Sequence, residues 1–413
     1  MTEAAPNAPS RLSIYIVAAE QSGDALGGAL IAALRARVSA LTLAGIGGEA
    51  MREAGIVSPF SIDELSIIGL TAIPEKLPLI FRRIREAAQA IVAAAPDALV
   101  IIDSPDFTHR VARRVRRLAP TLPIIDYVSP SVWAWRPGRA RAMRRYIDQV
   151  LAVLPFEPEV HRRLGGPPCA YVGHPLIEQA DDLRPNADEA RRRLSEPPLL
   201  LVLPGSRANE LRRHIGIFGA AVERLAARSG PIEVVLPTVP HLEEPVRAAV
   251  ARWAVPARVI VDPAGKWASF RRARAALAAS GTVTLELALA GVPTVAAYRL
   301  HPIEAVVARL IRLQSRLPSV ILANLVIGEN VVPEILQEDC TPERLALALE
   351  PILADTAERR RQIEAFGRLD RIMAVGGVSP SAEAAALVIE VARRGRQPAV
   401  AAKETGRLCS SPN

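Results

Sequence analysis

Residues 199–210, LLLVLPGSRANE, decide the fold class of this 413-residue chain. The five apolar residues Leu199–Leu203 predict a buried strand of a parallel sheet. Pro204 and Gly205 end that strand, and Ser206 is expected to start a helix. A strand that runs through a short loop into a helix N-terminus is typical of an anion site, because unpaired N–H groups and the helix dipole converge there.

Arg207 strengthens the prediction of an anion site. It would lie in the first turn of the helix, where the dipole disfavours a cation, so it needs a negative partner from outside. A diphosphate could supply that partner through bidentate hydrogen bonds. The alternative is that Ser206 is a plain N-cap and that Arg207 is solvated.

A second segment repeats this organisation. Ala275–Ala279 is a short apolar run, and a helix carrying Glu286 follows the loop Ser280, Gly281 and Thr282. Glu286 is placed like the acid that binds a ribose diol in nucleotide-binding α/β folds. Together the two loops predict a site for a nucleoside diphosphate. The GxGxxG spacing of a nicotinamide site is absent, and we expect no cofactor.

Composition excludes several classes of protein. Hydrophobic residues make up 50% of the chain and aromatic residues only 4%, which predicts aliphatic cores. The net charge of +8 comes mainly from arginine, which suits phosphate recognition but is equally explained by genomic base composition. Neither zinc-ligand spacing nor an RNA-binding signature is present, so no nucleic acid partner is expected. Three widely spaced cysteines, no signal peptide and no apolar run of about 18 residues predict a cytosolic protein, soluble or peripheral on a membrane.

Apolar runs alternate with helical stretches along the whole chain, which predicts two α/β domains of the Rossmann type facing each other across a cleft. The expected domains are residues 11–180, joined by a C-terminal helix at 380–395, and residues 186–375. Residues 1–10 and 396–413 read as disordered tails. A further helix is expected to begin near Pro333, and the segment 20–24 is expected to be a turn.

Asp103 follows the apolar strand Ala98–Ile102, and a carboxylate at the carboxyl end of a parallel strand points into the ligand crevice. Asp106 fits a helix cap better. The nearby loop 129–136 holds two tryptophans, which are more often core than site. The spacing of Asp103 and Asp106 does not match a metal-binding Asp-x-Asp pair, and no metal site is expected.

The segment 67–81 is apolar and leads into an arginine-rich stretch. Ile73, Leu77, Ile80 and Phe81 fall on one helical face, and Pro78 is expected to kink or shorten the helix. An apolar face beside arginines is typical of a membrane-surface segment. A core-facing helix with a solvated basic end fits the periodicity equally well.

These motifs together resemble the lipid-A-disaccharide synthase family, inverting glycosyltransferases of the two-domain GT-B type. The resemblance covers about residues 13–385. It rests on EQSGD, GIGG followed by Met51, IDSPDF, YVSPSVWAWRPGR, LPFEP, YVGHP, LPGSR, ASGTVTLE and PEILQ. The YVSPSVWAW block is the most specific of these motifs.

The resemblance implies a defined reaction. The donor would be UDP-2,3-diacylglucosamine, the acceptor 2,3-diacylglucosamine 1-phosphate (lipid X), and the products a β(1→6)-linked disaccharide 1-phosphate and UDP. It also implies a peripheral enzyme on the cytosolic face of the inner membrane, with the 67–81 segment facing membrane and acyl chains. The oligomeric state, with a homodimer as one option, stays open.

The family's functional residues carry over to matching positions. Asp103 would be the general base, Ser22 and Asp24 would belong to the first turn of the site, and Asn324, in a loop expected at 318–327, would lie near the diphosphate. The UDP site would contain Gly205, Ser206, Arg207, Ser280, Gly281, Thr282 and Glu286.

Two positions depart from the family pattern: Ala19 replaces a common Gly, and Ala323 stands where Pro is frequent. Rival readings are a UDP-sugar 2-epimerase, another GT-B transferase, and a catalytically idle nucleotide- or lipid-binding protein.

Overall fold

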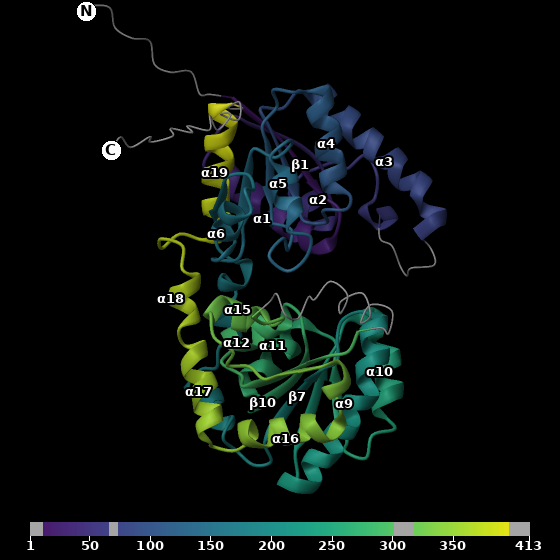
Figure 1. Cartoon of the computed structure of the whole chain (residues 1–413), viewed down its shortest axis with the longest axis vertical. Helices are drawn as coiled ribbons and strands as arrows, with labels where there is room; N and C mark the ends of the chain where they lie inside the picture. The colour runs from purple at the N-terminus through teal and green to yellow at the C-terminus, as the bar shows by residue number, and fades with distance from the viewer. Residues whose placement is uncertain (1–10, 66–72, 301–317, 396–413) are drawn as a thin grey trace, which may run out of the picture.

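The computed structural model describes residues 11–65, 73–300 and 318–395, with the side chains of 73–77 excepted. Two α/β units lie one above the other along the long axis of the molecule (Figure 1). Each unit is built on a six-stranded sheet in which all the paired strands are parallel. The expected α/β fold with two Rossmann-like units is therefore confirmed.

The first sheet has the strand order β2-β1-β3-β4-β5-β6. Its strands are β1 Leu12–Ala18, β2 Leu41–Ile46, β3 Ala98–Ile102, β4 Ile124–Tyr127, β5 Gln149–Ala152 and β6 Cys169–Tyr171. The helices between them are α1 Gln21–Arg35, α2 Glu49–Glu53, α3 Ile73–Ala94, α4 Thr108–Leu118, α5 Gly138–Met143 and α6 Glu157–Arg163, with a 3₁₀ turn η1 at Ile62–Leu65. β3 is buried along its whole length, as its unbroken apolar sequence predicts for a central parallel strand.

The second sheet has the order β12-β11-β10-β7-β8-β9. Its strands are β7 Leu199–Leu203, β8 Glu233–Pro237, β9 Ala257–Ile260, β10 Ala275–Ala279, β11 Thr294–Tyr298 and β12 Glu334–Leu336. The helices of this unit are α9 Ala208–Ser229, α10 Glu243–Val250, α11 Pro263–Arg272, α12 Val283–Leu289, α15 Leu322–Ile327 and α16 Pro342–Leu353, with 3₁₀ turns η4 Pro240–Leu242 and η5 Gln337–Asp339.

The segment between the sheets and the C-terminal segment both connect the two units. Between β6 and β7 lie η3 Pro175–Ile177, α7 Ala180–Leu183 and α8 Ala187–Arg192. After α16 the chain forms α17 Ala357–Phe366, α18 Leu369–Met373 and α19 Pro380–Arg394, which run along one side of the molecule from the second unit back to the first (Figure 1). There α19 packs against α1 and β3.

Strand order in each sheet reverses at one point, between β1 and β3 in the first sheet and between β7 and β10 in the second. The loops that leave the carboxyl ends of the two strands diverge to opposite faces at such a point, and open α/β sheets bind ligands in the crevice between them. The described part of the chain therefore has two such reversal points, one in each unit.

Four local expectations are wrong. The segment after Pro333 is the strand β12, because its backbone pairs with β11, and the next helix starts only at Pro342. Residues 21–24 form the first turn of α1 and not a loop. Pro78 lies inside the 22-residue helix α3, which continues past it, so the option that Pro78 shortens the helix is wrong. Asn324 lies on the short helix α15, where a loop was expected.

Candidate functional site

A cavity of about 310 Å³ lies at the reversal point of the second sheet, between the loops that follow β7 and β10. Both loops singled out in the sequence contribute to its wall. The predicted residues that line it are Gly205, Ser206, Arg207, Ser280, Gly281, Thr282 and Glu286. The structure thus brings together seven predicted residues from segments about 80 positions apart in the sequence.

The first loop is held by a residue that the sequence analysis missed. The buried carboxylate of Glu210 accepts hydrogen bonds from the backbone N–H groups of Ser206 (3.2 Å) and Arg207 (3.4 Å). Gly205 has a φ of +120°, and a β-carbon there would lie 2.5 Å from the Glu210 Cβ, so only glycine fits this turn. A signal was present in the sequence, since a glutamate three residues after an N-cap can accept from the backbone N–H group of that N-cap.

The sequence predicts Arg207 in the first turn of the helix, but in the structure this residue is the N-cap. Its guanidinium pairs with the Glu210 carboxylate, Nη1 to Oε1 at 3.1 Å, so the argument that it needs an external partner is wrong. The Arg207 side chain is nevertheless 81% exposed. An exposed guanidinium held by one bond at the rim of a cavity can turn to a phosphate at small cost.

The second loop begins with Ser280, whose hydroxyl donates to the Val320 carbonyl at 3.0 Å. One turn into α12, Glu286 lines the cavity and pairs with Lys266, Nζ to Oε2 at 2.6 Å. Lys266 lies on α11, lines the same cavity, and packs 4.5 Å from the centre of the Trp267 ring. The sequence does not indicate a role for this lysine, because no pattern within α11 shows which way its side chain points.

Asn324 lies beside these loops without lining the cavity. Its side chain is buried, and its carbonyl oxygen accepts from the N–H groups of Val331 (3.1 Å) and Val332 (2.9 Å). Its amide nitrogen donates to the Val332 carbonyl and to Glu334. In this arrangement the amide is engaged with the segment that leads into β12, and a bond to a diphosphate would have to replace one of these bonds.

Asp103 lies at the reversal point of the first sheet, directly after β3. Its backbone is left-handed, with φ +51°, and so is that of Ser104, with φ +44°. Strained backbone of this kind is concentrated at functional sites. One carboxylate oxygen accepts from the Ser104 N–H at 2.7 Å, and the other accepts from the Ser22 hydroxyl at 3.3 Å. Ser22 comes from the first turn of α1, so the helix that follows β1 and the loop that follows β3 meet at this carboxylate.

Two nearby aspartates have structural contacts. Asp24 is buried, and its carboxylate accepts from the N–H groups of Gly48, Ala50 and Met51, at the start of α2. These bonds hold the turn after β2 in place, so Asp24 supports the crevice through the backbone. Asp106 does not cap α4, contrary to expectation; it is exposed and lies 3.6 Å from Arg139.

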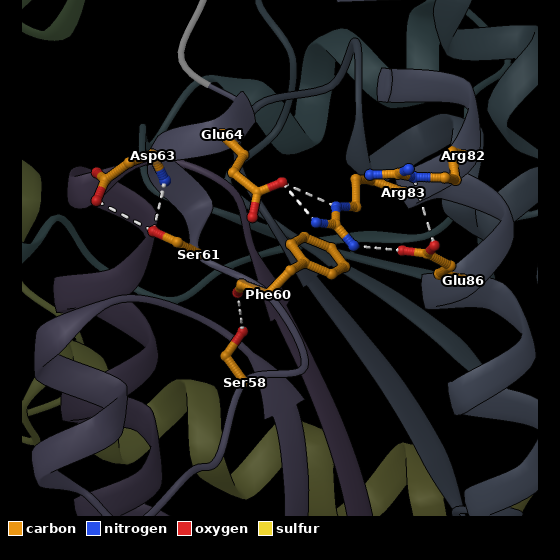
Figure 2. A network of polar contacts seen from close by, with 8 residues as sticks. All are labelled: Ser58, Phe60, Ser61, Asp63, Glu64, Arg82, Arg83 and Glu86. Carbon is orange, nitrogen blue, oxygen red and sulfur yellow. Dashed lines mark hydrogen bonds and ion pairs between the residues drawn. The ribbon is translucent and has the colours of Figure 1, made fainter. Parts of the chain in front are cut away.

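A second, open cavity of about 960 Å³ lies beside the first turn of α1. Gln21, Asp24, Gly48, Phe60 and Asp63 are among the residues that line it. Figure 2 shows how the segment with Phe60 is tied to the long helix α3. The guanidinium of Arg83 donates to Glu64 and to Glu86, both at 2.6 Å, and lies 4.8 Å from the centre of the Phe60 ring.

The described part of the predicted apolar face at 73–81 divides into two. Ile80 is partly buried against the core of the first unit, whereas Phe81 is 56% exposed, with the Arg110 guanidinium 5.8 Å from its ring centre. The side chains of Ile73 and Leu77 and the segment 66–72 lie outside the described residues. Among the described helices, none has the length and apolar character needed to span a membrane.

Buried polar and aromatic side chains hold the loop after β4 in place. The Ser129 hydroxyl lies 2.8 Å from His161 Nε2, and Trp133 packs edge-on against Phe156. Burial raises the pKa of Glu157 to about 8.

Over the described ranges, no group of three or more His, Cys, Asp and Glu side chains is arranged to hold a metal ion.

Comparison with known proteins identifies the family. Residues 14–381 match the family model described as "Lipid-A-disaccharide synthetase". The chain belongs to the lipid-A-disaccharide synthetase family. A lipid-A-disaccharide synthase of Nitrobacter hamburgensis is 59% identical over 392 residues, covering 95% of this chain and 98% of the relative. One of Bradyrhizobium diazoefficiens is 58% identical over 385 residues, 93% of this chain and 97% of the relative. The family resemblance expected from the motifs is confirmed.

Solved structures support the fold alone, because their sequences are distant. The UDP-GlcNAc 2-epimerase of Neisseria meningitidis bound to UDP-GlcNAc has a TM-score of 0.60 at 11% identity, covering 92% of this chain and 99% of that one. The calicheamicin glycosyltransferase CalG4 has a TM-score of 0.55 at 17% identity, covering 92% of this chain and 98% of that one. The fold therefore occurs in both epimerases and glycosyltransferases, and distinguishing these activities requires evidence other than the fold.

Proposed function

We propose that this protein is an inverting glycosyltransferase that makes the lipid A disaccharide from a UDP-sugar donor and a lipid-linked acceptor. In detail, it would transfer 2,3-diacylglucosamine from UDP to the 6-hydroxyl of 2,3-diacylglucosamine 1-phosphate. Family membership over nearly the whole chain supports the activity. The observation that carries the mechanism is the placement of Asp103 at the reversal point of the first sheet and of the Gly-Ser-Arg loop at that of the second, where it lines a cavity.

The donor would bind in the second unit. Its diphosphate would lie over the loop at Gly205, Ser206 and Arg207, with the loop at Ser280 on the other side, and Glu286 would accept from the ribose hydroxyls. As the bond from the sugar to the β-phosphate breaks, negative charge grows on UDP. The exposed Arg207 guanidinium is placed to stabilise that charge, and one preorganised donor of this kind contributes about 3 kcal/mol.

The acceptor would bind against the first unit, with its 6-hydroxyl at Asp103. A primary alcohol is a weak acid, so its oxygen needs to lose its proton as it bonds to the anomeric carbon. Asp103 would take that proton, a contribution of about 10²–10⁴-fold, while UDP leaves from the opposite face of the sugar and the configuration inverts. The Ser22 hydroxyl would orient the carboxylate. Because Asp103 and Arg207 belong to different units, the reaction requires the two units to close on the substrates.

The base assignment is tested by the Asp103→Asn variant. Asparagine keeps the size and the acceptor oxygen but cannot take a proton, so turnover should fall by at least about 100-fold while UDP affinity stays near wild type. Asp106→Asn is the matched control, since Asp106 is exposed in the same loop. Retention of more than about a tenth of the wild-type rate would contradict the role of Asp103.

Incubation with both acylated sugars separates this activity from its rivals. A disaccharide synthase releases UDP only when the acceptor is present, and one disaccharide forms for each UDP. A 2-epimerase would convert or hydrolyse the donor without acceptor, and a binding protein would release no UDP. Appearance of UDP without disaccharide would therefore refute the proposed reaction.

We further propose that the protein binds the cytosolic face of the inner membrane through the start of α3. The exposed Phe81 beside Arg110, with Arg82 and Arg85 also exposed, offers an apolar anchor among cations that suits an anionic lipid surface. Phe81→Ser should reduce sedimentation with anionic vesicles without lowering the melting temperature. The control Leu194→Ser removes an exposed apolar residue from the chain segment that connects the two sheets. It should change neither vesicle binding nor the melting temperature. Unchanged vesicle binding of Phe81→Ser would count against this surface.

A further inference from the structure

His214 lies on α9, and no motif in the sequence around it links this residue to the site. Its ring is fully buried. Nδ1 lies 2.9 Å from the Pro204 carbonyl oxygen, at the start of the Gly-Ser-Arg loop, and Nε2 lies 3.1 Å from the backbone nitrogen of Arg299, directly after β11. In the sheet, β10 separates β7 from β11, so the ring links the exits of two strands that are not neighbours.

These two contacts determine the protonation state of the ring. The Pro204 oxygen can only accept, so Nδ1 must carry a hydrogen. The Arg299 amide can only donate, so Nε2 must present its lone pair. Only the neutral Nδ1–H tautomer satisfies both. A proton added at Nε2 would face the Arg299 N–H group at close range and break that contact.

We infer that His214 is a positioning residue of the donor site: its neutral ring holds the Gly-Ser-Arg loop in register with the exit of β11, and its protonation breaks the bond to Arg299 and so uncouples the loop from that exit. The consequence for donor binding rests on the function proposed above. The link itself is a property of the free protein.

The surroundings of the ring favour the neutral form. Phe218 stacks on it with ring centres 5.5 Å apart, and Tyr298 lies against it at 5.2 Å. The charged groups nearby are Glu210 and Arg213 on α9 and Arg299 at the end of β11. Burial lowers the pKa of His214 most; the bond to Pro204 and the charge of Glu210 act in the opposite direction, and Arg213 adds to the lowering.

Loss of the link should affect the donor and not the acceptor. Pro204 directly precedes Gly205, whose conformation brings the amides of Ser206 and Arg207 to Glu210. Release of the Pro204 carbonyl would let this loop move as a unit. The donor KM should then rise, whereas the acceptor, bound on the other unit, should keep its KM.

Two variants separate the two halves of the link. His214→Asn places an amide N–H near the position of Nδ1 and can keep the bond to Pro204, but it loses the acceptor for Arg299. His214→Gln reaches the position of Nε2 and can keep the bond from Arg299, but it loses the bond to Pro204. Because each loses one hydrogen bond and leaves one buried backbone group unpaired, we expect each to raise the donor KM by about tenfold. The exposed His241, changed to Asn, is the matched control.

The experiment measures hydrogen-exchange protection of the Ser206, Arg207 and Arg299 amides in the free full-length protein, alongside the His214 ring titration and the donor KM. In wild type, the Arg299 amide should lose protection as His214 takes up its proton, while Nδ1–H keeps its bond to Pro204, and the donor KM should rise over the same pH range. At neutral pH, His214→Asn should lose protection at the Arg299 amide, whereas His214→Gln should keep it and lose protection at the Ser206 and Arg207 amides. Neither variant should show the titration. Titrating protection without any UDP binding would support the link and refute only the proposed donor site. Protection that does not follow the His214 titration, or variants with a lower melting temperature but an unchanged donor KM, would overturn the inference.

Discussion

Replacing Glu157 by Gln should make the protein more stable at alkaline pH. Glu157 is 2% exposed, at the start of α6, and burial raises the pKa of its carboxyl group from 4.5 to about 8. The Leu154 N–H, which donates to the carboxylate at 3.1 Å, acts against this rise, and the nearby charge of Asp126 adds to it. Gln keeps an acceptor oxygen for Leu154 but cannot ionise.

The sign and size follow from linkage. Below pH 4.5 the carboxyl group is protonated in both the folded and the unfolded protein, so it has no pH-dependent effect. Between pH 4.5 and about 8 the unfolded chain loses the proton and the folded protein keeps it, so the free energy of unfolding falls by about 1.4 kcal/mol per pH unit. The full loss is on the order of 5 kcal/mol at pH 8 and above. The variant should escape it.

Urea unfolding at pH 5 and pH 8.5 measures this effect. In a Trp253→Phe, Trp267→Phe background, fluorescence reports on the tryptophans of the first unit, including Trp133, which packs against the residue next to Glu157. The stability of the variant relative to wild type should rise by several kcal/mol between the two pH values. Glu159→Gln, on the exposed side of the same helix, should show no such change. A difference between Glu157→Gln and wild type that is independent of pH would refute the reasoning.

Three further predictions concern the donor unit. Arg207→Ala should weaken UDP binding and slow turnover by at least about tenfold, because it removes a cation from the leaving phosphate; calorimetry and steady-state rates with both unchanged would contradict its role. Arg193 donates to four carbonyls at the ends of α11 and α12, so Arg193→Met should cost about 3 kcal/mol in urea unfolding, whereas the exposed Arg192→Met should cost little. Gly205→Ala should lower the melting temperature and the UDP affinity together, because the positive φ and the contact with Glu210 both oppose a side chain; wild-type values for both would show that the turn adapts.

The sequence predicted the strands well wherever they are buried on both faces. β3, β7 and β10 have the expected bounds, because an unbroken apolar run between loop residues has few other interpretations. It failed for β12, a three-residue edge strand whose only requirement is backbone pairing with β11. The pattern of apolar and polar residues does not predict such a strand, because its residues are all partly exposed.

The site was predicted less completely than the fold. Motif positions indicated seven residues that the structure brings together around one cavity. Contacts between side chains were missed, because they depend on which way each side chain points. Glu210 could have been found from its spacing to Arg207, but the pairing of Lys266 with Glu286 joins two helices that the sequence separates by 20 residues.

Asp103 and Arg207 each lie at the reversal point of a separate sheet. This separation explains how the proposed roles of general base and phosphate ligand can be independent. The Asp103 carboxylate is held by groups of the first unit, Ser22 and Ser104, and Arg207 is held by Glu210 of the second. Neither arrangement depends on the other, so in the proposed reaction each unit would bind its own substrate before the units meet. The proposed reaction then requires only the approach of two preformed half-sites. It follows that removing the Asp103 carboxylate should leave UDP affinity unchanged, and removing the Arg207 guanidinium should leave acceptor affinity unchanged. A defect in the α17–α19 connection should instead slow turnover without weakening the binding of either substrate.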